Sequence, residues 1–149
     1  MRIAVAADHA GFVLKEGLLS AIREAGHDIS DFGAYRLDPN DDYPDFVIPL
    51  ARAVASGGTD RGIAVCGSGV GACIAANKVP GVRAALCGDT FSARQGVQDD
   101  AVNILCLGAR VIGPSLALEL VHVFLGANYA GLERFQRRLD KITALEQRK

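Results

Sequence analysis

The sequence predicts an α/β protein with three layers, in which a five-stranded parallel sheet lies between two layers of helices. The first evidence is an alternation repeated along the chain: short apolar runs of β-compatible residues are followed by segments whose apolar residues have helical spacing. The second is that strands linked through helices pair in parallel, with right-handed crossovers that place helices on both faces of the sheet. A β-sandwich or a helical bundle would not show this alternation.

The individual elements follow from this pattern in order. Residues 2–7 are an apolar run, and the segment 11–26 that follows has apolar side chains at helical spacing: Phe12, Leu14, Leu18, Leu19 and Ile22. The pattern then recurs, with strands predicted at residues 27–33, 61–66, 82–87 and 103–108 and helices at 44–57, 70–78 and 90–99. We expect these strands to adopt the flavodoxin-like, Rossmann-like order 2-1-3-4-5.

The length of the chain limits how many domains it can form. With 149 residues there is room for one core, so we expect residues 1–149 to form a single domain. Residues 114–125 and 132–149 are also helical in pattern, which is more than a five-stranded sheet needs to cover its faces. The last of them is therefore predicted to be an extra C-terminal helix available for dimer contact. Residues 38–43 form the most polar loop and are expected at the surface.

Composition and charge exclude several classes of partner. Sixteen Lys and Arg residues against seventeen Asp and Glu residues leave a net charge of -1, so no general positive field attracts nucleic acid or an anionic membrane. The sequence has no Trp and only 6% aromatic residues, which argues against a stacking platform for single-stranded nucleic acid. We expect neither a nucleic-acid nor a membrane partner, and any anion site must be local.

Cysteine usage and the N-terminus indicate a cytoplasmic protein without a metal. No CxxC pair or His-containing cluster has the spacing of metal ligands, so the cysteines are interpreted as reduced thiols. The chain reaches Asp8 and His9 before a signal-like region can form, and no apolar run approaches the ~18 residues of a membrane span. The cysteines all lie in apolar surroundings: Cys66, Cys73, Cys87 and Cys106.

Reactive residues gather where three of the predicted strands end. The first strand is followed by Asp-His-Ala-Gly at 8–11, the third ends in Cys-Gly-Ser-Gly-Val-Gly at 66–71, and the fifth ends in Gly-Ala-Arg at 108–110. Ligands of open parallel sheets bind beyond the carboxyl ends of the strands. We therefore expect these segments to converge on one crevice.

The glycine-rich segment 67–71 has three possible interpretations. It can point backbone N–H groups and the positive end of a helix dipole at an anion, it can be a merely compact turn, or it can belong to a dinucleotide site with Asp89. The spacing is G-x-G-x-G rather than G-x-G-x-x-G and follows the third strand, which favours the anion cradle over the dinucleotide site. Cys66, just before the turn, is a competent base or nucleophile if it is a thiolate, or else an inert core residue.

Further candidates have weaker local signals. Arg134 and Arg138 are four residues apart on one helical face and could grip a phosphate, but the mixed charges around them equally fit a solvated surface, which the pattern alone favours. His9 can be a hydrogen-bonded loop histidine. Its position at a strand end beside Asp8 favours a functional role.

Five motifs in order give the chain a resemblance to a known family. They are Ala-Asp-His-Ala-Gly at 7–11, Asp-Asp-Tyr-Pro at 41–44, Cys-Gly-Ser-Gly-Val-Gly at 66–71, Ala-Ala-Asn-Lys at 75–78 and Gly-Ala-Arg-Val at 108–111. Together they resemble the ribose-5-phosphate isomerase B family, whose relatives include galactose-6-phosphate isomerase subunits. The resemblance implies a flavodoxin-like fold, a homodimer with active sites between subunits or a tetramer of such chains, no metal and no cofactor. It also implies interconversion of an aldose phosphate and a ketose phosphate.

The resemblance also implies roles for individual residues. Cys66 would be the general base that moves a proton between C2 and C1. A branch of the family has a Glu where this chain has Ala72, so the chain is of the cysteine type. By the same resemblance, the cradle for the enediolate oxygen would be formed by Gly67, Ser68, Gly69, Val70 and Gly71. The sugar would be contacted by Asp8 and Tyr43. The phosphate would be bound by His9, Arg110, Arg134 and Arg138.

One departure from the family concerns ring opening. A His-Asn pair opens the furanose ring and steadies the sugar in the family, and the aligned residues here are Asp99 and Asp100. We expect one of three consequences: Asp99 does the work with Asp100 contacting the sugar, ring opening is slow, or the substrate is acyclic. The expected substrate is ribose 5-phosphate, converted through a cis-enediolate. The alternatives are a hexose 6-phosphate, a tetrose 4-phosphate, a non-catalytic phosphometabolite-binding module or a dinucleotide oxidoreductase.

Overall fold

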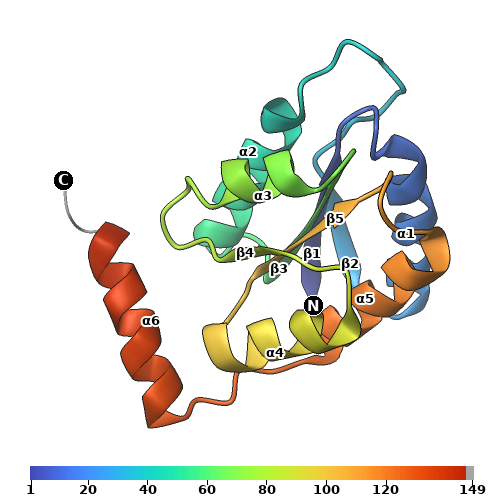
Figure 1. The fold of residues 1–149 in the computed structure, drawn as a ribbon. Helices are drawn as coiled ribbons and strands as arrows, with labels where there is room; N and C mark the ends of the chain where they lie inside the picture. Colours follow the sequence, from blue (N-terminus) through green and yellow to red (C-terminus); the bar gives the residue numbers. More distant parts are fainter. Residues whose placement is uncertain (147–149) are drawn as a thin grey trace.

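The computed structural model describes residues 1–146 and shows a parallel sheet covered by helices on both faces (Figure 1). The predicted elements are present, with ends that differ by one or two residues; residues 147–149 of the last predicted helix lie outside the described residues. The strands are β1 (Arg2–Ala7), β2 (Asp28–Asp31), β3 (Arg61–Cys66), β4 (Ala84–Leu86) and β5 (Ile104–Gly108). The helices are α1 (Phe12–Glu24), α2 (Tyr43–Ala55), α3 (Val70–Ala76), α4 (Thr90–Asp100), α5 (Pro114–Gly126) and α6 (Glu133–Glu146).

Alternate side chains of the sheet build two apolar cores. Ile3 and Val5 of β1 point into the core that the sheet shares with α1, α4 and α5, whereas Ala4 and Ala6 point into the core shared with α2 and α3. The strands β3 and β5 alternate in the same way, so central strands buried on both faces are almost wholly apolar. The predicted three-layer α/β fold with a five-stranded parallel sheet is confirmed.

The predicted strand order 2-1-3-4-5 is wrong, because the observed order is β2-β1-β3-β5-β4. All five residues of β5 are buried, and a strand of this kind needs a neighbour on each side. In contrast, β4 has only three residues, of which Leu86 is 43% exposed, and short strands with exposed side chains belong at an edge. The exchange makes Cys66 and Gly108 register partners at the ends of β3 and β5.

The C-terminal helix α6 stands away from the sheet and packs beside α4 (Figure 1). It buries Phe135 and Leu139, whereas Ile142 and Leu145 remain exposed. The helix therefore presents apolar surface that its own chain leaves uncovered. Across residues 1–146, no helix has both the length and the apolar character needed to cross a bilayer.

Candidate active site

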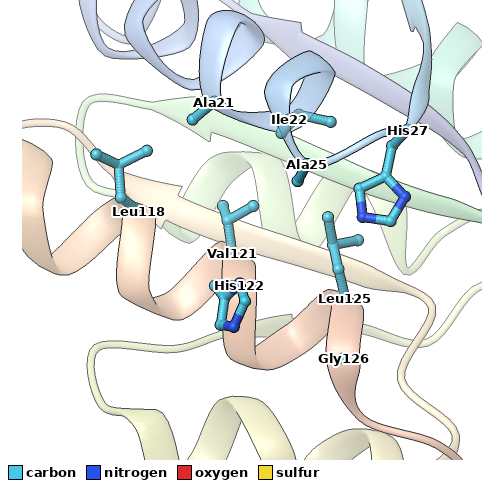
Figure 2. Close-up of a pocket in the computed structure, with 9 residues that line it drawn as sticks. All are labelled: Ala21, Ile22, Ala25, His27, Leu118, Val121, His122, Leu125 and Gly126. Atoms are coloured by element: carbon cyan, nitrogen blue, oxygen red, sulfur yellow. The ribbon is translucent and has the colours of Figure 1, made fainter.

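A cavity of about 380 Å³ opens beyond the carboxyl ends of β1, β3 and β5. It contains eight of the residues that the sequence singled out: Asp8, His9, Tyr43, Cys66, Gly67, Ser68, Gly71 and Arg110. A larger cavity of about 460 Å³ between α1 and α5 is lined mainly by apolar side chains, with His27 and His122 at its wall (Figure 2). That cavity holds no carboxylate, thiol or guanidinium group, so we place the chemistry in the smaller one.

The thiol of Cys66 is held by the turn that follows β3. The residue is 4% exposed, and the backbone N–H of Gly69 donates a hydrogen bond to its Sγ at 3.1 Å. Gly69 has a φ of 80°, and a Cβ there would lie 2.9 Å from the carbonyl carbon of Leu107, so the turn requires glycine. The bond orients the sulfur and places an N–H donor where a thiolate carries its negative charge.

Glycine also allows an aromatic side chain to reach the cavity. A Cβ on Gly71 would lie 2.7 Å from Cζ of Tyr43, which begins α2. The bare backbone at this position therefore lets the phenol ring lie directly against the start of α3. The hydroxyl of Tyr43 is thereby brought to the same cavity as Cys66.

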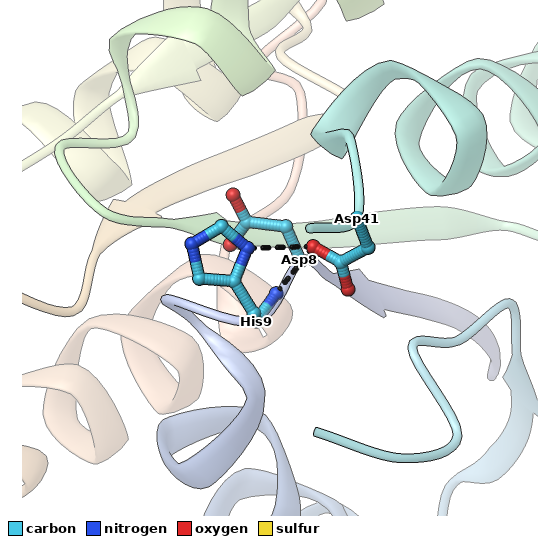
Figure 3. Close-up of side chains that lie close together, drawn as sticks. All are labelled: Asp8, His9 and Asp41. Atoms are coloured by element: carbon cyan, nitrogen blue, oxygen red, sulfur yellow. Dashed lines mark hydrogen bonds and ion pairs between the residues drawn. The ribbon is translucent and has the colours of Figure 1, made fainter. Parts of the chain in front are cut away.

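Positive charge is supplied by two neighbouring loops. Arg110 is fixed by its backbone N–H, which donates to the Gly67 carbonyl at 2.9 Å. His9 donates from its backbone N–H and from Nδ1 to the Asp41 carboxylate, at 2.9 and 2.7 Å (Figure 3). The Asp41 hydrogen bond is the main cause that raises the pKa of His9 above its ordinary value of 6.5. His9 and Arg110 therefore offer a local anion site in a chain with little net charge.

Asp41 is the residue that sequence reasoning missed. It lies in the loop between β2 and α2, and its only sequence signal was its place in a polar loop and in the motif 41–44. One oxygen each from Asp8 and Asp41 and a ring nitrogen of His9 lie within 4.8 Å of one another. The hydrogen bond from His9 Nδ1 to Asp41 holds two of these atoms together.

Six predicted site residues do not line this cavity in one chain. Gly69 and Val70 belong to the segment 67–71 but are not among the residues that line the cavity. Asp99 and Asp100 end α4 near the start of β5, roughly 13 Å of strand away from Gly108. Asp99 accepts a hydrogen bond from Gln95 at 2.9 Å. Arg134 and Arg138 lie on α6. Their guanidinium carbons are 4.7 and 5.9 Å, respectively, from the centre of the Phe135 ring.

The three other cysteines also lie outside the cavity. Burial raises the pKa of Cys87 to about 11. A hydrogen bond between Cys73 and Cys106 lowers the pKa of Cys73 to about 6 and, together with burial, raises that of Cys106 well above its ordinary value. Cys66 is therefore the one cysteine of the chain that faces the anion site.

Residues 3–142 match the family model described as Ribose/Galactose Isomerase. The chain belongs to this family. The resemblance to ribose-5-phosphate isomerase B that the motifs predicted is confirmed. An enzyme named ribose-5-phosphate isomerase B from Escherichia coli is 43% identical over 99% of this chain and 98% of its own length.

Two further relatives show the range within the ribose/galactose isomerase family. The D-erythrulose-4-phosphate isomerase of Pectobacterium atrosepticum is 40% identical over 88% of this chain and 86% of its own. The ribose-5-phosphate isomerase B of Mycoplasma genitalium, solved with bound ribulose 5-phosphate, is 41% identical and superposes with a TM-score of 0.95 over 99% of this chain and 97% of that one. Members thus differ in the sugar phosphate that their names report.

Proposed function

We propose that this protein is an aldose-ketose isomerase of sugar phosphates that converts ribose 5-phosphate into ribulose 5-phosphate. The observation that carries the proposal is the content of one cavity, where the oriented thiol of Cys66 shares a small space with His9 and Arg110. A weak carbon acid needs a positioned base, preorganised hydrogen-bond donors and a grip on the rest of the substrate. Relatives from the same family are named for this reaction.

In the proposed reaction a proton moves from C2 to C1 while the carbonyl group moves from C1 to C2. The Cys66 thiolate removes the C2 proton, and the electron pair left behind forms the C1–C2 double bond as negative charge develops on O1. N–H groups of the turn 67–71 stabilise the resulting cis-enediolate. The Cys66 thiol then returns the proton to C1, and the O2 hydroxyl proton is transferred to O1, so that O1 becomes the C1 hydroxyl as the C2 carbonyl forms. Asp8 and Tyr43 contact the sugar hydroxyls.

A second copy of the chain completes the site in this proposal. Apolar side chains beside the cavity and the outer edge of β4 remain uncovered, namely Val70, Ile74, Leu86 and Phe91, which are 43 to 64% exposed. One chain does not bring its α4 and α6 to its own cavity, so four predicted site residues do not reach it: Asp99, Asp100, Arg134 and Arg138. A partner packed on this face brings its own α4 and α6 toward that cavity. Each chain, residues 1–149, then forms one domain of a homodimer. It supplies half of each of the two active sites, which the two chains share.

Mixing two defective variants tests the shared site. We expect Arg134→Ala to raise KM by about tenfold or more, the cost of removing a charged partner of the phosphate, and Cys66→Ala to lower kcat strongly, so both are defective at substrate concentrations well below KM. If the two residues come from different chains, a mixed dimer keeps one intact site, and an equal mixture regains about a quarter of wild-type activity. Arg137→Ala is the matched control, because Arg137 pairs with Glu133 at 3.0 Å, whereas Arg134 lies over the Phe135 ring. No recovery on mixing would place both residues in one chain's site.

A tetrose 4-phosphate is the second candidate substrate. The position expected to open the furanose ring carries the carboxylate of Asp99, which accepts a hydrogen bond from Gln95 rather than offering a proton. A tetrose 4-phosphate has its ring-closing oxygen blocked by the phosphate and needs no ring opening. The family also contains the D-erythrulose-4-phosphate isomerase.

A coupled assay that compares ribose 5-phosphate, a hexose 6-phosphate and erythrulose 4-phosphate tests the substrate and the function together. We expect turnover of ribose 5-phosphate at a rate limited by ring opening, so that Asp99→His increases it and leaves the erythrulose 4-phosphate rate unchanged. A rate with ribose 5-phosphate that Asp99→His does not improve would show that ring opening is not limiting. Absence of turnover with all three compounds would contradict the proposed function.

A further inference from the structure

We propose that Asp41 is the positioning residue of the anion site: its carboxylate keeps the His9 imidazole charged and directs Nε2 at the phosphate of the ligand. The inference rests on the proposed function only in taking the ligand to carry a phosphate group. Asp41 itself does not line the cavity, so it acts through His9.

The geometry determines which nitrogen faces the ligand. A single oxygen of Asp41, Oδ1, accepts the backbone N–H of His9 at 2.9 Å and the ring Nδ1 at 2.7 Å (Figure 3). Because Nδ1 is the donor in this bond, Nε2 is the nitrogen left for the cavity that His9 lines. Two bonds to one carboxylate oxygen fix both the main chain and the ring, so the direction of Nε2 is set before a ligand arrives.

The burial of Asp41 indicates why the imidazole is charged. Only 10% of its side chain is exposed, and Oδ2 is buried without a hydrogen-bond partner among the described residues. An unpartnered buried carboxylate oxygen is costly unless a positive charge lies beside the group. Protonated His9 supplies that charge. The hydrogen-bonded pair is thus most stable when the imidazole is protonated.

Three charged groups face His9 from three segments. Asp41 comes from the loop before α2, Asp8 from the end of β1 and Arg110 from the loop after β5. The hydrogen bond to Asp41 is the largest influence and raises the pKa of His9, Asp8 raises it further, and burial and Arg110 lower it. With the pKa raised, the imidazolium persists to a higher pH than an ordinary histidine, and phosphate binding through Nε2 is lost only as pH rises through that raised value.

The loop that carries Asp41 is held at its start. Lys15 is fully buried in α1, and its Nζ donates to the Asp31 carboxylate at 2.9 Å and to the Ala34 carbonyl at 2.8 Å. At the other end, Asp42 is the residue from which α2 begins. The Asp41 carboxylate is therefore delivered to His9 by a segment anchored on both sides.

Asp41→Asn tests the inference, because the amide oxygen can accept the same two hydrogen bonds without the charge. We expect Kd for inorganic phosphate to rise about tenfold or more at a pH between the His9 pKa values of the two proteins, and to stay within about twofold of wild type at a pH below both, where His9 is protonated in both proteins. At a given pH, inorganic phosphate has the same charge in the measurements on wild type and on Asp41→Asn. The ratio of their two Kd values therefore reports the change at His9. Asp42→Asn is the matched control, since the neighbouring exposed residue undergoes the same charge change without contacting His9, and we expect no change at either pH.

Proton NMR titration gives a readout that needs neither turnover nor a stable variant. The chain has three histidines, and wild-type His9 should titrate above its ordinary pKa of 6.5 and at a lower pH in Asp41→Asn. The inference is overturned if wild-type His9 titrates at or below the ordinary value, or if Asp41→Asn weakens phosphate equally at both pH values, as a purely structural role would. Phosphate binding that follows the expected pattern in a protein without isomerase activity would contradict the proposed function and leave the role of Asp41 intact.

Discussion

Cys66→Ala is expected to slow proton transfer on ribose 5-phosphate by about 10² to 10⁴-fold, and to lower kcat once this step becomes slower than ring opening, while leaving Kd for inorganic phosphate unchanged. A positioned general base contributes about this much to proton transfer from carbon, and no other thiol reaches the cavity to replace it. The phosphate contacts proposed for His9 and Arg110 do not involve the sulfur, so binding should persist. Turnover is measured in the coupled assay and phosphate affinity by calorimetry.

Cys87→Ala is the matched control for this variant. Cys87 and Cys66 are both 4% exposed, and both lie where a strand ends, so the two substitutions remove the same buried group. Only Cys66 faces the cavity. Equal losses of activity in the two variants would indicate a packing effect and remove Cys66 from its role as base. A wild-type protein that binds phosphate but has no turnover to lose would instead be a phosphometabolite-binding module.

The location of the cavity could be predicted from the sequence because it depends on a general rule for parallel sheets. Asp8, Cys66 and Arg110 follow three strands, and the carboxyl ends of parallel strands meet at one edge whatever their order. The prediction therefore survives the error in the strand order. That error arose because the strand order was taken over from flavodoxin-like folds, although the three-residue, partly exposed β4 could not occupy the place of the fully buried β5.

The rest of the site depends on interactions that no periodicity encodes. Asp41 reaches His9 across 32 residues through the path of a loop, and loop paths leave no repeating signal in the sequence. Arg134 and Arg138 lie on a helix that stands away from the sheet, so one chain alone does not bring them to the cavity (Figure 1). The sequence pattern alone favoured a solvated surface there, because charges of both signs surround the two arginines.

Gly108→Ala is expected to disable the site without touching any side chain in it. A Cβ on Gly108 would lie 2.5 Å from the carbonyl oxygen and 2.6 Å from the carbonyl carbon of Ser68, and backbone atoms cannot rotate out of the way as a side chain does. The turn must move instead. Because the N–H of Gly69 orients Cys66, we expect kcat/KM to fall by about 10²-fold or more, as displacements near 1 Å do in active sites.

The same substitution separates the effect on geometry from the effect on stability. Overpacking costs about 1 to 3 kcal/mol of unfolding free energy, which chemical denaturation measures and which leaves the variant folded at room temperature if the wild type has ordinary stability. Gly113→Ala, five residues farther on, meets nothing within 4 Å and should leave kcat/KM unchanged. Wild-type kcat/KM in Gly108→Ala would mean that the turn tolerates displacement, and that the N–H donors of residues 67–71 do not stabilise the enediolate. Because β3 and β5 are adjacent only in the observed strand order, the coupling between Gly108 and Cys66 is also a functional test of that order.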